Sequence, residues 1–132
     1  MPNHPNREDA LALLHEYTKS DSLRRHALGV EQAMVKMAEK YDGDLNEWGI
    51  AGLLHDFDYE MYPTMEEHPY KGNEILKDKG YPESICKAIM GHATYTGVTR
   101  DTDMAKALFS VDELTGFIFA VTYVRPSRSI FE

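Results

Sequence analysis

The chain has 132 residues, enough for one compact domain, and its 42% hydrophobic and 27% charged residues are typical of a globular protein. The formal net charge of −8 argues against a surface for nucleic acid, because no cluster of Lys and Arg overrides it. A single cysteine, Cys86, excludes an intrachain disulfide and agrees with a reducing compartment. No signal-peptide pattern and no apolar run of ~18 residues is present. We therefore expect a single cytoplasmic domain that binds neither nucleic-acid polymers nor membranes, and its oligomeric state stays open.

Hydrophobic spacing predicts three helices in the first half of the chain. The first covers about residues 7–17, with Asn6 as its N-cap. The second begins near Ser20 and ends before Gly43. Its apolar residues recur every three or four positions and predict one buried stripe: Leu23, Ala27, Val30, Met34, Met37 and Tyr41. The third, at about residues 46–54, is apolar on nearly every side and is expected to be a central helix.

Three further helices are predicted after a polar, Pro-containing loop at residues 58–67. They are expected at residues 69–79, 82–92 and 102–114 or beyond. Residues 93–102 read as a loop, residues 117–124 are ambiguous between helix and strand, and residues 125–132 read as a tail. Six helices with short connections predict an all-α, single-domain bundle.

The most informative feature is the pair His55-Asp56, which closes the predicted central helix. An imidazole and a carboxylate at the end of a buried helix are costly unless something satisfies both. A divalent metal ion would do so, because His supplies a nitrogen ligand and Asp an oxygen ligand. The pair alone fits a solvated His equally well, since the C-terminal end of a helix favours a positive charge.

Four more residues point to the same corner of the bundle. His26 projects from the edge of the apolar stripe of the second helix, and Asp112 lies among apolar neighbours on the last helix. His68 and His92 stand at the start of the fourth helix and the end of the fifth. Each has an ordinary alternative: a satisfied core histidine, an Asp bonded to a backbone donor or a Lys, or a helix-end residue.

The ordered series of His26, His55-Asp56, His68, His92 and Asp112 resembles the HD superfamily of metal-dependent phosphohydrolases. The resemblance covers about residues 20–116 of a single domain 1–132. The surrounding segments are similar too: Leu23-Arg24-Arg25-His26, Gly52-Leu53-Leu54-His55-Asp56, His68-Pro69-x-x-Gly72, Ile89-x-x-His92 and Val111-Asp112-Glu113-Leu114.

The resemblance implies an α-helical bundle with one metal ion held by His26, His55, Asp56 and Asp112. In two-metal members the equivalent of Asp56 bridges both ions, and the equivalents of His68 and His92 bind the second. The mixed ligands fit Mn, Fe, Ni, Co, Zn or Mg without selecting one. The implied activity is hydrolysis of a phosphate ester or anhydride, with a nucleotide as the leading small substrate, by metal-activated water.

The residues that would assist the reaction are less well defined. Many relatives carry Lys or Glu shortly after the His-Asp pair, where this chain has Phe57-Asp58-Tyr59-Glu60. We take Asp56, which is also a candidate metal ligand, and Asp58 as the candidate catalytic residues. Asp58 would orient a ligand or water, and a loop-capping Asp is the alternative for it. Lys71 and Arg25 are candidates for contacts with phosphate, and a solvated surface cation is the alternative for each.

Two other functions stay open. A minority of HD-like proteins, of the myo-inositol-oxygenase type, use a similar ligand series to hold two irons and activate oxygen. A non-catalytic module that binds metal or a nucleotide is the other alternative. Iron with spin-resonance signals would favour the first, and nucleotide binding without turnover would favour the second.

Overall fold

The computed structural model describes residues 6–124, with side chains described as far as residue 114. Within that range every regular element is a helix, as predicted. The elements are α1 (Arg7–Tyr17), α2 (Asp21–Tyr41), α3 (Leu45–Leu54), α4 (Tyr70–Asp78), α5 (Glu83–His92), a short 3-10 helix η1 (Thr94–Thr96) and α6 (Asp103–Val124). The ambiguous segment 117–124 continues α6, so it is helix and not strand. The predicted tail at 125–132 lies outside the described residues.

Side-chain caps fix where the first three helices begin. The side-chain oxygen of Asn6 accepts a hydrogen bond from the backbone N–H of Asp9 at 2.8 Å, and Ser20 accepts one from Leu23 at 3.3 Å. Asp44 caps α3 in the same way. Because these oxygens satisfy backbone donors that have no partner inside the helix, each is expected to stabilise its helix by about 1 kcal/mol. The predicted N-cap of α1 is confirmed.

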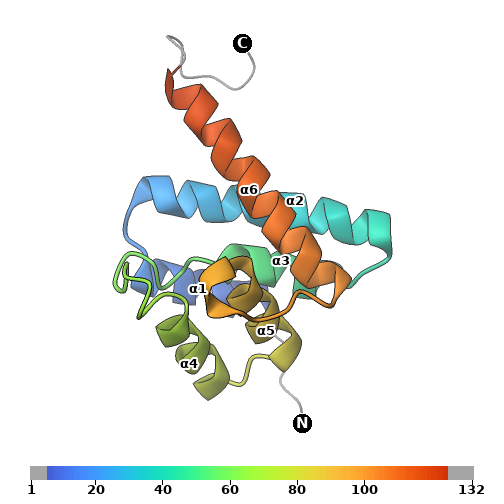
Figure 1. The fold of residues 1–132 in the computed structure, drawn as a ribbon, viewed down its shortest axis with the longest axis horizontal. Helices are drawn as coiled ribbons and strands as arrows, with labels where there is room; N and C mark the ends of the chain where they lie inside the picture. Colours follow the sequence, from blue (N-terminus) through green and yellow to red (C-terminus); the bar gives the residue numbers. More distant parts are fainter. Residues whose placement is uncertain (1–5, 125–132) are drawn as a thin grey trace.

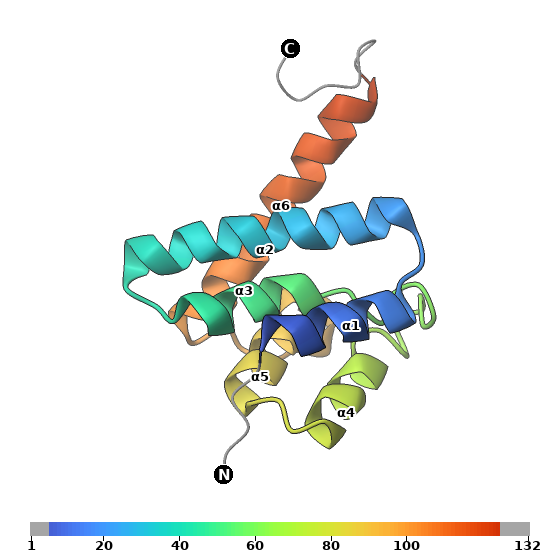
Figure 2. The ribbon, with the colours of Figure 1, turned by 180° about the vertical axis from the view of Figure 1, so that it is seen from behind.

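The short helix α3 lies at the centre of the fold, as its apolar sequence predicts. Every residue of α3 from Trp48 to Leu54 is buried. Figures 1 and 2 show α2 running alongside α3, with α1 on the other side. At Gly52 an added Cβ would lie 2.9 Å from the carbonyl oxygen of Val30 and 2.9 Å from Met34 Cγ. The absent side chain thus allows α2 and α3 to pack closely.

The remaining helices close the bundle around α3. Helix α6 crosses α2 and packs against α5, which in turn contacts α4 (Figures 1 and 2). The interior of the predicted α2 stripe is confirmed by the burial of Ala27, Val30 and Met34, but Tyr41 is 51% exposed. Tyr41 is the last residue of α2, where the helix gives way to a turn. No helix among the described residues is long and apolar enough to cross a membrane.

One buried charge was not predicted. Glu31 on α2 is only 4% exposed, and its carboxylate accepts hydrogen bonds from Nε of Arg7 at 2.6 Å and Nη2 of Arg7 at 3.1 Å. This two-point ion pair satisfies the buried carboxylate. It joins the start of α1 to the middle of α2.

Candidate metal centre

Five separate segments bring the six predicted ligand residues together. His26 lies on α2 and Asp112 on α6, while His55 and Asp56 follow directly after α3. The other two residues, His68 and His92, precede α4 and end α5. They form two groups that could each hold a metal ion, and Asp56 belongs to both.

The first group contains His26, His55, Asp56 and Asp112, each of which offers one ligand atom within 4.8 Å of the others. Nε2 of His26 lies 3.1 Å from Oδ1 of Asp112, and Nε2 of His55 lies 2.9 Å from the same oxygen. His55 is completely buried, and the other three are partly buried. Two imidazole nitrogens and two carboxylates from three segments therefore surround one point.

The second group contains Asp56, His68 and His92. Oδ1 of Asp56 lies 3.2 Å from Nε2 of His68 and 3.2 Å from Nε2 of His92. The other oxygen of Asp56, Oδ2, lies 3.3 Å from Nε2 of His55 in the first group. Each oxygen of Asp56 thus faces a different group, which is the arrangement of a bridging carboxylate.

The second nitrogen of three histidines faces an oxygen. Nδ1 of His55 lies 2.7 Å from the carbonyl oxygen of Gly52, and Nδ1 of His92 contacts the carbonyl oxygen of Ile89. Nδ1 of His68 lies 2.6 Å from Oδ1 of Asp58. Because these oxygens can only accept, Nδ1 must carry the proton, and in the neutral ring Nε2 keeps its lone pair. Each Nε2 lone pair points at a carboxylate oxygen, and these two groups repel each other. A cation between the nitrogen and the oxygen, or a second proton on the ring, would remove that repulsion.

The pKa values of His55, His68 and Asp56 also show that this site favours positive charge on the imidazoles and negative charge on the carboxylate. Burial alone would lower the pKa of His55, but the neighbouring carboxylates outweigh it and raise that pKa well above its usual value. At His68 burial also lowers the pKa, whereas Asp56 and Asp58 raise it to about 9. Burial would raise the pKa of Asp56, yet the surrounding imidazoles hold it well below its usual range. A divalent cation can replace those protons and satisfy the same oxygens, so the donor set fits a metal.

Asp58 supports the second group from behind. It is 1% exposed, and both of its oxygens are engaged: Oδ1 with His68 and Oδ2 with the backbone N–H of Gly72 at 2.9 Å. A side chain this buried does not reach a substrate in an open cleft. The bond to His68 is that of a residue that orients a ligand, and the bond to Gly72 is that of a capping Asp, so its catalytic role stays a prediction.

The loop that carries Asp58 is fastened to the turn between α1 and α2. The hydroxyl of Thr18 donates to the carbonyl oxygen of Phe57 at 2.9 Å. The carboxylate of Glu60 accepts from the backbone N–H groups of Lys19 at 2.6 Å and Ser20 at 2.9 Å. Glu60 thus stabilises the positive end of α2, which is a structural role.

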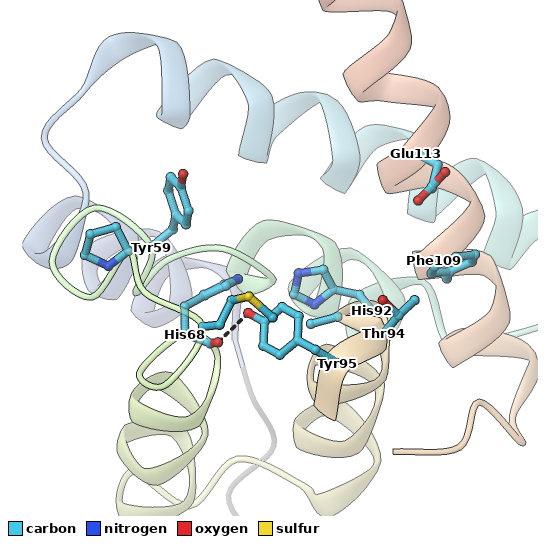
Figure 3. Close-up of a pocket in the computed structure, with 10 residues that line it drawn as sticks. Tyr59, His68, His92, Thr94, Tyr95, Phe109 and Glu113 are labelled. Atoms are coloured by element: carbon cyan, nitrogen blue, oxygen red, sulfur yellow. Dashed lines mark hydrogen bonds between the residues drawn. The ribbon is translucent and has the colours of Figure 1, made fainter. Parts of the chain in front are cut away.

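A cleft of about 340 Å³ opens over the second group. His68 and His92 form its floor, with Tyr59 on one side and Phe109 and Glu113 of α6 on the other (Figure 3). Sequence reasoning did not assign a function to these aromatic and acidic residues, because they come from separate segments and share no spacing. Lys71 and Arg25 are exposed and do not line this cleft, and their contact with phosphate stays a prediction.

The fold and the centre define a class of helical domains in which His and Asp residues from several helices gather into groups that could hold metal ions. A protein-family model of the HD domain matches residues 23–115. Because the match covers most of the chain, the protein belongs to the HD domain family. The family inferred from the six spaced His and Asp residues is confirmed.

Two curated relatives match the chain at similar identity. It is 29% identical over 119 residues to the symmetrical bis(5'-nucleosyl)-tetraphosphatase of Staphylococcus aureus, covering 80% of this chain and 59% of that protein. It is 28% identical over 88 residues to the tRNA (cytidine(56)-2'-O)-methyltransferase of Thermoplasma volcanium, covering 67% of this chain and 26% of that protein. The chain thus spans less than two thirds of either relative. No solved structure matches the chain.

Proposed function

We propose that this chain is a metal-dependent phosphohydrolase that cleaves a phosphate ester or anhydride of a nucleotide. The observation that carries the proposal is the position of Asp56, whose two oxygens face separate groups of histidine Nε2 atoms. Membership of the HD domain family and the likeness to a nucleotide-cleaving relative support the same reaction class.

In this proposal the two groups of residues have distinct roles. His26, His55, Asp56 and Asp112 hold one divalent ion, and Asp56 holds a second together with two further histidines, His68 and His92. Bound divalent ions lower the pKa of water and stabilise negative charge on phosphoryl oxygens. The carbonyl oxygens behind His55 and His92 keep the ligand nitrogens pointing inward, so the chain arranges the centre before substrate binds.

Asp58 is a positioning residue in this proposal. Its buried carboxylate holds the proton on Nδ1 of His68, so that Nε2 is available to a metal ion. Lys71 and Arg25 remain candidates for phosphate contact, and replacing each by Ala would raise KM more than it lowers kcat if they serve that role.

Metal content is the first test. We would measure metal in gently purified protein by elemental analysis, and compare wild type with Asp56→Ala and with the exposed control Asp78→Ala. We expect about one or two ions per chain in wild type and the control, and a strong loss in Asp56→Ala, because both groups share Asp56. The metal found would then be used to screen nucleotides for phosphate release. Protein that holds no metal, and takes up no Mn, Fe, Ni or Zn, would overturn the proposal.

A further inference from the structure

The cleft over the second group of ligands has an unusual lining for a phosphate site. Three aromatic rings border it, from Tyr59, Tyr95 and Phe109, and among its described lining residues Glu113 is the only charged side chain other than histidine. None of the ten described residues that line it is Lys or Arg. Tyr59 and Tyr95 are 43% and 40% exposed, so both rings are free to contact a ligand.

These rings are held in place by other contacts. Tyr59 meets the ring of His68 edge-on, with 5.5 Å between centroids. The hydroxyl of Tyr95 donates to the carbonyl oxygen of His68 (Figure 3). On the other side, the guanidinium of Arg100 lies 4.0 Å from the centroid of Phe109 and donates to the carbonyl oxygen of Gly91 at 2.7 Å. The nearby Arg100 is therefore engaged in supporting a wall of the cleft.

The charge of the site limits how many phosphate groups it suits. Asp56 and Asp112 are the two carboxylates among the six proposed ligands, so two divalent ions would leave an excess of two positive charges. One phosphate monoester dianion neutralises that excess. A polyphosphate would extend its further charge into a cleft whose described lining residues include a carboxylate, Glu113, and no Lys or Arg.

We propose that this cleft binds a flat, uncharged aromatic group of a phosphate monoester, the class that includes nucleoside monophosphates. The phosphate lies at the metal centre, the aromatic group lies against Tyr59 and Tyr95, and Glu113 accepts a hydrogen bond from an N–H or O–H of that group. A volume of about 340 Å³ is at the low end for small-molecule sites and suits one nucleoside rather than two. This inference rests on the proposed function and narrows it from esters or anhydrides to monoesters.

Adenosine binding tests the cleft independently of catalysis, because adenosine has no phosphate to hydrolyse. We would titrate metal-loaded protein with adenosine and with ribose, using saturation-transfer NMR. We expect adenosine to bind and ribose to give no saturable signal. Tyr59→Ala should weaken adenosine binding about three- to tenfold, as expected for one aromatic contact, while the exposed control Tyr41→Ala should not. Equal binding by the two variants, or equal binding of adenosine and ribose, would overturn the proposal.

Selectivity among phosphorylated compounds gives a second readout. We expect kcat/KM to be higher for AMP than for ATP, and higher for AMP than for glycerol 2-phosphate, which has no aromatic group. Glu113→Gln should move the AMP-to-ATP ratio toward one, whereas Glu74→Gln on the exposed face of α4 should leave it unchanged. A preference for ATP in wild type would overturn the monoester assignment.

The two proposals fail in different ways. If no ester is hydrolysed with any metal but adenosine binds through Tyr59, the proposed hydrolase function is wrong and the aromatic subsite stands. If AMP is hydrolysed but Tyr59→Ala binds adenosine as wild type does, the hydrolase stands and the aromatic subsite is wrong.

Discussion

Asp58 lies 2.6 Å from Nδ1 of His68 through one oxygen and 2.9 Å from the backbone nitrogen of Gly72 through the other. The carboxylate therefore joins a proposed metal ligand to the first turns of α4. Because Asp58 is buried, water does not substitute for either bond. Asp58 is therefore one of the contacts that position His68, together with the hydroxyl of Tyr95, which donates to the carbonyl oxygen of His68.

Asp58→Asn should weaken binding of the second metal ion and leave the first in place. An Asn side chain has one acceptor oxygen and an NH2 group that only donates, so it cannot place an acceptor opposite both His68 and Gly72 as the two oxygens of Asp58 do. Loss of such a supporting carboxylate typically reduces metal affinity by about 10–100-fold. Metal titration followed by calorimetry would show the change in the weaker of two binding steps.

Glu60→Gln is the matched control, because Glu60 is in the same loop but bonds to backbone N–H groups and not to a histidine. It is expected to lower stability slightly, through a weaker cap on α2, and to leave both metal affinities unchanged. If Asp58→Asn and Glu60→Gln have the same metal affinities, Asp58 does not position His68.

Gly72→Ala should disturb the same contact by crowding. An added Cβ would lie 2.8 Å from Cγ and 2.8 Å from Oδ2 of Asp58. We expect overpacking to cost roughly 1–3 kcal/mol, which exceeds the gain of about 1 kcal/mol that Ala brings to a helix. Urea unfolding measures the stability, and metal titration should show a weaker second ion.

Gly49→Ala provides the comparison for Gly72→Ala. Its added Cβ would meet only side-chain atoms of Val35 at 3.1 Å and Glu31 at 3.8 Å, and it lies in the centre of α3 away from the ligands. We expect a smaller loss of stability and unchanged metal binding. A Gly72→Ala protein that binds two ions as tightly as Gly49→Ala would show that the loop adapts without moving His68.

The helices were predictable because their signals are local. Apolar spacing and caps such as Asn6 depend only on neighbouring residues, so the boundaries agree with the structure within one or two positions. The exception is the end of α6, which was predicted at residue 114 or beyond and lies at Val124. Tyr41 was misjudged because periodicity alone does not show that the stripe ends before the helix does. The six candidate ligands could be named from the sequence because the combination of their residue types and their order along the chain is specific to one family.

The supporting and cleft residues could not be predicted in the same way. Asp58 meets His68 only because the loop between them folds back, and no spacing rule describes that loop. Tyr59, from the loop before α4, and Tyr95, from η1, line the same cleft, and Glu113 reaches it through the crossing of α6. Each of these contacts is tertiary, so it becomes visible only once the helices are packed.

Arg7→Ala should destabilise the fold without affecting the metal centre. The Glu31 carboxylate would remain buried and lose the guanidinium that pairs with it, which is expected to cost roughly 1–3 kcal/mol. Replacing both residues, as Arg7→Ala with Glu31→Leu, should recover part of that loss, because no buried charge is left. Urea unfolding of the single and double variants tests this. An Arg7→Ala protein as stable as wild type would show that the pair contributes nothing net.

Cys86 offers a probe of α5, the helix that ends in His92. The thiol is 2% exposed, and burial raises its pKa, so both access and thiolate formation are suppressed in the folded chain. We expect it to react slowly with a disulfide reagent at pH 8 and rapidly in denaturant.

The rate of this reaction should depend on metal, because a bound ion held by His92 must be released before α5 opens. Metal at about 100 times its Kd should therefore slow the reaction by about 100-fold. His92→Ala should retain slow labelling but lose most of this metal dependence. Equal labelling rates with and without metal in wild type would mean that α5 opens independently of the metal centre.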